Sequence, residues 1–127
     1  MSQPTVAILG ASADRTKFGN KSVRAHLKAG YQVYPINPKG GDIEGLVVYK
    51  SLRDVSADSL DRISVYLPPA VTLKLLPEIA AKRCTELWLN PGSESDEVVV
   101  AARQLGLEPI MACSIVGVGS SPHEFEP

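Results

Sequence analysis

Short runs of apolar residues alternate along this chain with longer segments in which apolar residues recur at helical spacing. Strands separated by helices in this way pair in parallel through right-handed crossovers. The alternation therefore predicts the α/β class, with a single doubly wound, mostly parallel sheet. Strands are expected at residues 5–9, 31–36, 46–49 (at an edge), 62–67, 85–89 and 107–112, and helices at 20–29, 70–83 and 93–105.

Capping residues and one proline set the expected helix boundaries. Asn20 is expected to cap the first helix and Gly30 to end it. Pro77 lacks a backbone donor, so the second helix should kink or restart there. Ser93 is the expected cap of the third helix and Gly106 its end, while residues 51–59 have room for one helical turn.

Composition indicates one globular domain. The chain has 127 residues, of which 44% are hydrophobic and 21% charged. No apolar run approaches the roughly 18 residues of a membrane-spanning helix, and the first residues lack the pattern of a secretory signal. We expect a domain over residues 1–113 and, because residues 114–127 are rich in Gly, Ser and Pro, a partly disordered tail.

The number of cysteines indicates the cellular compartment, and the net charge indicates which classes of partner to expect. Cys84 and Cys113 are too few for a disulfide scaffold and lack the spacing of a metal site. A reducing cytoplasm is therefore the expected location. The net charge of −1 disfavours a nucleic acid as partner, although a small anion held in one local basic pocket suits it. We expect no membrane partner, and the sequence carries no signal for an oligomeric state.

The first strand is followed by a candidate anion site. Doubly wound sheets bind ligands beyond the carboxyl ends of their strands, and here that end has the sequence Gly10-Ala11-Ser12, with Arg15 and Lys17 close behind. A glycine turn that leads into a helix N-terminus leaves backbone amides free to bind a diphosphate. The alternative is an ordinary connection with solvated cations.

The glycine fingerprint of dinucleotide-binding domains is incomplete. Ser12 replaces its second glycine, and the next glycine is Gly19. The second strand ends in Asn37-Pro38-Lys39, without the acid that would hold the ribose hydroxyls of NAD. Lys39 would suit an additional ribose phosphate, or it is a solvated loop lysine.

Three further strand ends carry candidate binding residues. Leu67-Pro68-Pro69 forms a rigid apolar surface that could support an adenine ring, or it merely stops a strand. Asn90-Pro91-Gly92 is a polar turn of either functional or ordinary kind. Cys113 falls on the same edge, where it would contact a thiol or thioester or pack as a small apolar side chain.

In order and spacing these motifs resemble those of the small stand-alone CoA-binding proteins, whose fold is shared with the N-terminal domain of the succinyl-CoA synthetase alpha subunit. The similarity covers about residues 5–113 and rests on residues 6–12, 34–38, 39–41, 67–69 and 87–92 and on Cys113. It implies a Rossmann-like fold and coenzyme A or an acyl-CoA as ligand.

The resemblance also implies a role for each matching position. Gly10, Ala11, Ser12 and Lys17 would hold the diphosphate, and Asn37, Pro38 and Lys39 the side of the ribose 3′-phosphate. Leu67 and Pro68 would contact adenine. Asn90, Pro91, Gly92 and Cys113 would lie along the pantetheine arm.

The sequence does not present a catalytic group at these strand ends. His26 falls within the first helix, His123 lies in the tail, and no pair of acids occupies the edge. Acyl or phosphoryl transfer needs a positioned base or nucleophile. We therefore expect a non-catalytic CoA-binding module. The alternatives are an NADP-dependent oxidoreductase-like domain and a structural interaction domain whose ligand site is vestigial.

Overall fold

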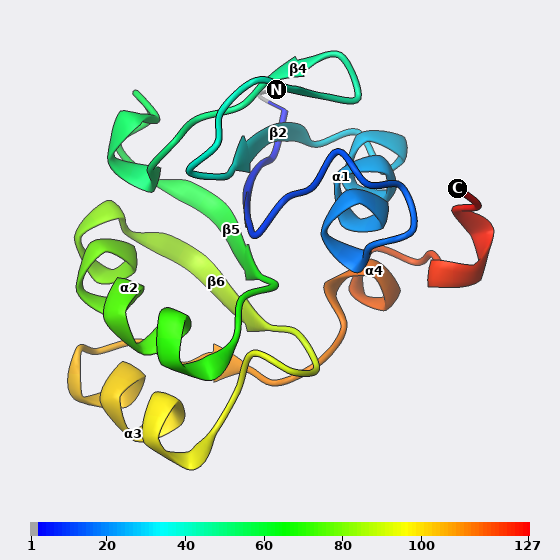
Figure 1. Ribbon diagram of the computed structural model, residues 1–127. Coiled ribbons are helices and arrows are strands. Elements are labelled where there is room, and N and C mark those ends of the chain that lie inside the picture. Colours follow the sequence, from blue (N-terminus) through cyan, green and yellow to red (C-terminus); the bar gives the residue numbers. More distant parts are fainter. Residues whose placement is uncertain (1–2) are drawn as a thin grey trace.

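The computed structural model describes residues 3–127 (Figure 1). Met1 and Ser2, on which the expectation of no secretory signal partly rests, lie outside the described residues. A five-stranded sheet, parallel throughout, forms the centre, with the strand order β2-β1-β5-β6-β7. Its strands are β1 (Thr5–Leu9), β2 (Gln32–Ile36), β5 (Leu60–Val65), β6 (Cys84–Leu89) and β7 (Pro109–Ile110).

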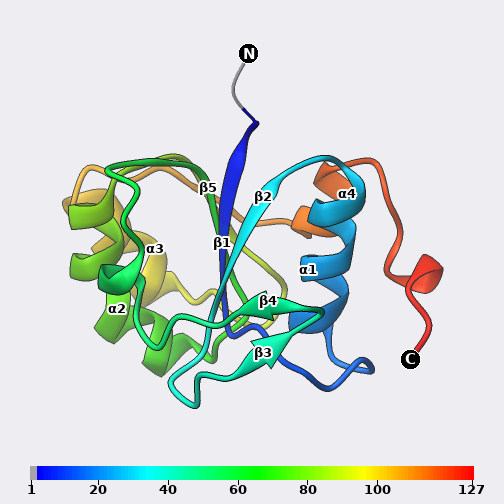
Figure 2. The ribbon, with the colours of Figure 1, turned by 90° about the horizontal axis from the view of Figure 1, so that it is seen from above.

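Helices cover both faces of this sheet (Figure 2). One face carries α1 (Phe18–Lys28) and α4 (Ser114–Gly117), and the other carries α2 (Pro69–Lys82) and α3 (Asp96–Gln104). The chain winds outward from β1 in one direction to β2 and in the other to β5. The switch point, where such folds bind ligands, therefore lies between β1 and β5.

Burial explains why β1 reads as an unbroken apolar run. Val6, Ala7 and Ile8 are fully buried, because helices pack on both faces of the central strand. Val6 and Ile8 face the core beneath α1, whereas Ala7 and Leu9 face the core beneath α2 and α3. The predicted doubly wound α/β fold is confirmed.

The first helix begins earlier than predicted. The residue before it is Lys17, which makes no side-chain capping bond, and Asn20 lies fully buried inside the helix. The amide of Asn20 donates to the carbonyl oxygen of Ser12 at 2.9 Å and to Glu44 at 3.1 Å. The predicted Asn20 cap is wrong because tertiary contacts use that side chain, while the predicted end at Gly30, with φ of 92°, is confirmed.

The other two long helices differ from the prediction in detail. Helix α2 continues through Pro77 as one element, so the expected restart is not found. Helix α3 is capped by Ser95, whose hydroxyl accepts from the N–H of Val98 at 3.2 Å. Ser93 is not the cap, because its buried hydroxyl donates instead to the carbonyl oxygen of Asn90 at 2.7 Å.

The predicted edge strand at residues 46–49 forms a separate hairpin. Strands β3 (Asp42–Ile43) and β4 (Leu46–Val47) pair antiparallel in a sheet of their own. Glu44 and Gly45, both with positive φ, make the two-residue turn that closes such a hairpin. The backbone of Tyr49 pairs with the main sheet at an isolated bridge with Ile36. The helical turn expected in residues 51–59 is confirmed as the 3-10 helix η1 (Leu52–Asp54).

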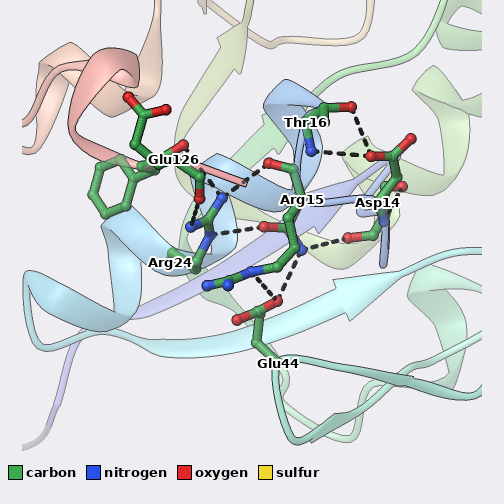
Figure 3. A network of polar contacts seen from close by, with 9 residues as sticks. Asp14, Arg15, Thr16, Arg24, Glu44 and Glu126 are labelled. Atoms are coloured by element: carbon green, nitrogen blue, oxygen red, sulfur yellow. Dashed lines mark hydrogen bonds and ion pairs between the residues drawn. The ribbon is translucent and has the colours of Figure 1, made fainter.

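The C-terminal segment packs against α1, and the predicted partial disorder of residues 114–127 stays a prediction. Ile115 of α4 and Phe125, which follows the 3-10 helix η2 (Pro122–Glu124), pack with Ala25 in one buried cluster. Arg24 donates to the carbonyl oxygen of Glu126 at 2.7 Å (Figure 3). The burial of these apolar side chains and the hydrogen bond from the charged Arg24 side chain hold the segment in place. Within residues 3–127, no helix is both long enough and apolar enough to cross a bilayer.

Candidate functional site

Two glycines bring the end of β1 against the start of α1. Gly10 has φ of 85°, and a Cβ there would lie 2.6 Å from the carbonyl oxygen of Tyr66. A Cβ on Gly19 would collide with the carbonyl oxygen of Gly10. Gly19 thus permits the close approach of helix and strand that a fingerprint glycine provides in related folds. Sequence reasoning gave it no role, although a glycine in a helix's first turn was the available signal.

Several backbone donors around this turn are unused. The N–H groups of Ala11, Ser12, Phe18 and Gly19 donate no hydrogen bond within residues 3–127. The first turn of α1 contains no acidic residue, and Lys17 stands directly before it. Free N–H groups, the positive end of the helix dipole and a cation together favour an anion.

This turn opens on a cleft of about 400 Å³, which we call the α1 cleft. It extends from the N-terminus of α1, past the end of β5, to the turn after β6. Its lining residues are Gly10, Lys17, Phe18, Gly19, Tyr66, Leu67, Pro68, Pro91, Gly92 and Ser93.

A second cleft, of about 260 Å³, lies on the other side of the switch point, and we call it the apolar cleft. It runs between the end of β2, η1 and α2. It shares Gly10 and Leu67 with the α1 cleft, so the two clefts adjoin at these residues. Its other lining residues are Leu9, Ile36, Pro38, Lys50, Ser51, Leu52, Arg53, Val71, Leu75, Glu78 and Ile79.

The structure brings seven of the thirteen predicted site residues to the walls of these clefts; they are Gly10, Lys17, Pro38, Leu67, Pro68, Pro91 and Gly92. Ala11 is buried in the glycine turn. Ser12 follows it, and its hydroxyl accepts from the N–H of Asp14 at 3.0 Å. Both contribute free backbone donors to the turn.

Asn37 shapes the loop after β2 through its own side chain. Its amide donates to the carbonyl oxygen of Ala11 at 2.8 Å, and its side-chain oxygen accepts from the N–H of Lys39 at 2.9 Å. Lys39 is exposed and lines neither cleft. Lys50 lines the apolar cleft instead, and its side chain lies across Gly40. Lys50 was missed, although a lysine directly after an apolar run at this edge was a signal.

Asn90 lies behind the α1 cleft and is 1% exposed. Its amide donates to the hydroxyl of Ser64 at 2.8 Å, and its oxygen accepts from the N–H of Ser114 at 2.7 Å. Ser114 also contacts the hydroxyl of Tyr66 at 3.0 Å. Burial raises the pKa of Tyr66 above its usual value, so its hydroxyl stays protonated. Asn90 thus fixes the turn that carries Pro91 and Gly92.

Cys113 directly precedes α4 and is half-buried beside the cluster of Ile115 and Phe125. It lines neither cleft. Its predicted contact with a pantetheine arm stays a prediction. In the described part of the chain, no group of three or more His, Cys, Asp or Glu residues is placed to hold a metal ion.

A parallel, doubly wound sheet with a glycine turn and a helix N-terminus at its switch point defines the class of Rossmann-like α/β domains. Within that class, residues 4–119 match the CoA binding domain family, and the chain belongs to this family. The resemblance inferred from the strand-end motifs is thereby confirmed for the family. The match extends beyond the predicted domain boundary at residue 113 into α4.

Relatives with curated names are CoA ligases much longer than this chain. The alpha subunit of an ADP-forming acetate–CoA ligase I from Pyrococcus furiosus is 29% identical over 134 residues, covering 93% of this chain and 29% of that protein. An ADP-forming acetate–CoA ligase from Methanocaldococcus jannaschii is 37% identical over 78 residues, 61% of this chain and 11% of that protein. The chain therefore spans less than a third of either ligase.

Solved structures include proteins of similar size. A conserved hypothetical protein from Pyrococcus furiosus has a TM-score of 0.80 and 33% identity, covering 90% of this chain and 98% of that one. A Thermus thermophilus protein has a TM-score of 0.81 and 29% identity, covering 96% of this chain and 89% of that one. An acetyl-coenzyme A synthetase from Candidatus Korarchaeum cryptofilum, in complex with phosphate and ADP, has a TM-score of 0.73 and 25% identity over 85% of this chain and 25% of that one.

Proposed function

We propose that this protein binds coenzyme A, free or acylated, as a module without chemistry of its own. The observation that carries the proposal is the set of unused N–H groups of Ala11, Ser12, Phe18 and Gly19 beside Lys17. These donors suit a diphosphate. Membership of the CoA binding domain family and similarity to CoA ligases support the choice of this nucleotide.

The two clefts can hold the two parts of coenzyme A that are joined by its diphosphate. With the diphosphate at the glycine turn, the adenosine side would lie in the apolar cleft between Pro38 and Leu67. The pantetheine arm would follow the α1 cleft toward Pro91 and Gly92. Both halves then meet at Gly10, which lines both clefts.

The side chains that line the clefts support a binding role rather than catalysis. They include no histidine, cysteine or aspartate. Elsewhere, burial lowers the pKa of His26 to about 4, and burial followed by the charge of Glu86 raises the pKa of Cys84 to about 11. At neutral pH both groups are neutral, with His26 fully buried and Cys84 half-buried, which suits neither a general base nor a nucleophile. Two free thiols suit the reducing cytoplasm, where we place the protein.

Calorimetric titration with CoA, dephospho-CoA and NADP tests the proposal. We expect one CoA per chain, with weaker binding of dephospho-CoA, which lacks the 3′-phosphate. Tighter binding of NADP than of CoA would instead favour an oxidoreductase-like domain. If none of the three bound, a structural domain with a vestigial site would be the better account. In a parallel assay, acetyl-CoA incubated with the protein should lose its thioester no faster than in buffer.

A further inference from the structure

Glu78 is the one carboxylate among the residues that line the two clefts. It lies on α2 between the apolar cleft and a smaller cleft of about 250 Å³ beside Arg53 and Lys82, lines both, and has a side chain that is 19% exposed. Its Oε1 atom accepts from the hydroxyl of Ser51 at 2.7 Å and from the backbone N–H of Arg53 at 3.2 Å. These two bonds fix the orientation of the carboxylate.

The second oxygen of Glu78 is free. Oε2 takes part in none of the hydrogen bonds or ion pairs formed within residues 3–127, since the longer ion pair with Arg53 also goes to Oε1, at 3.9 Å. A carboxylate oxygen of this kind can only accept a hydrogen bond. A group that enters the apolar cleft and meets Oε2 must therefore present a donor.

The surroundings of Glu78 indicate what kind of group carries that donor. Leu67, Val71 and Leu75 line the cleft from the α2 side, and Ile36 and Pro38 line it from the end of β2. Apolar walls with one fixed acceptor suit a flat heterocycle that carries an amine. Lys50 and Arg53 also line this cleft but offer only donors.

We propose that Glu78 selects adenine over 6-oxopurines, by accepting a hydrogen bond from the exocyclic amine at Oε2. This inference rests on the proposed function, because it assigns the base of the bound nucleotide to the apolar cleft. A hypoxanthine or guanine ring presents a carbonyl oxygen at the same position. That oxygen would face the carboxylate without a hydrogen atom between them, and a site whose buried polar groups are left unpaired rejects such an analogue.

The same carboxylate also stabilises η1 through its hydrogen bonds with Ser51 and Arg53. The test must therefore separate recognition of the base from this structural role. The variant Glu78→Gln does so. Its carbonyl oxygen can accept both bonds that Oε1 accepts now. The amide NH₂ must then take the place of Oε2 and turn a donor toward the base. Glu108→Gln makes the same chemical change on an 81% exposed side chain far along the chain and serves as the matched control.

The experiment compares the affinities for CoA and for its analogue with hypoxanthine in place of adenine. We expect the wild-type protein and Glu108→Gln to bind CoA about tenfold more tightly than the analogue. In Glu78→Gln this preference should vanish or invert, because the amide donor suits the 6-oxo group.

Equal affinities of the wild-type protein for the two ligands would overturn the inference while leaving CoA binding intact, and this comparison does not require the variant to fold. An unchanged preference for CoA in a folded Glu78→Gln protein would overturn it as well. If the wild-type protein bound neither ligand, the proposed function would fail and the inference with it.

Discussion

The Nε2 atom of His26 lies 3.4 Å from Nη1 of Arg62, and both side chains are buried between α1 and the sheet. The Nδ1 atom of His26 lies 2.8 Å from the carbonyl oxygen of Ser22 and donates to it. Nε2 is then the unprotonated nitrogen that accepts from Arg62. Arg62 itself lies over the rings of Tyr31 and Trp88 and pairs with Glu86 at 2.9 Å.

This buried neutral imidazole predicts a loss of stability on mild acidification. Burial, first of all, and then the charge of Arg62 lower the pKa of His26 from 6.5 to about 4. Between these values the unfolded chain binds a proton that the folded protein does not. The stabilisation is therefore complete above pH 6.5 and declines as pH falls toward 4, by on the order of 3 kcal/mol.

Urea unfolding at a series of pH values would measure this decline. The variant His26→Gln should be less stable than wild type at pH 7 but should show a much flatter profile between pH 6.5 and 4. Glu86, whose pKa lies below its usual 4.5 owing first to the bond from Trp88, also loses stabilisation as pH falls toward 4, but it does so in both proteins and cancels in the difference between their profiles. Parallel profiles for the two proteins would contradict the assignment.

The second prediction concerns Gly19 and links the free energy of unfolding to the affinity for CoA. In Gly19→Ala the new methyl group must push α1 away from the carbonyl oxygen of Gly10. We expect a loss of about 1–3 kcal/mol in the free energy of unfolding, together with weaker CoA binding, because the N–H groups at the start of α1 move. Leu27→Ala, on the exposed side of the same helix, should leave the affinity unchanged. If Gly19→Ala bound CoA as tightly as wild type, the glycine turn would not be the diphosphate site.

The third prediction concerns Lys39 and Lys50, the two lysines near Gly40. The resemblance assigns the ribose 3′-phosphate to Lys39, but Lys50 is the lysine that lines the apolar cleft. We expect Lys50→Ala to weaken CoA by about tenfold, as for loss of one charge-assisted contact, and to leave dephospho-CoA nearly unaffected. Lys39→Ala should have the smaller effect. Calorimetry with both ligands distinguishes the lysines, and the opposite ranking would restore the assignment to Lys39.

Local patterns were sufficient to predict the five strands of the central sheet, although not that residues 46–49 lie outside it. The central strands are buried on both faces, so their apolar runs stand out from the amphipathic helices between them. The glycine turn after β1 was equally visible, because a tight turn before a helix needs Gly10 at positive φ.

Features that depend on distant partners could not be predicted in the same way. Asn20 looks like a helix cap, yet its amide is used by Ser12 and Glu44. Asn90 looks like a ligand-binding turn residue, yet its side chain joins Ser64 to Ser114, two segments far from it in the sequence. The role of Glu78 likewise depends on η1, which packs against α2 only in the folded chain.

The backbone amide resonances of Ala11, Ser12, Phe18 and Gly19 offer the most direct test of the diphosphate site. Titration of the isotopically labelled protein with CoA should shift these amides most strongly, and dephospho-CoA should shift the same set, because both ligands carry the diphosphate. Saturating CoA that left these resonances in place, or that perturbed a different surface, would contradict the account.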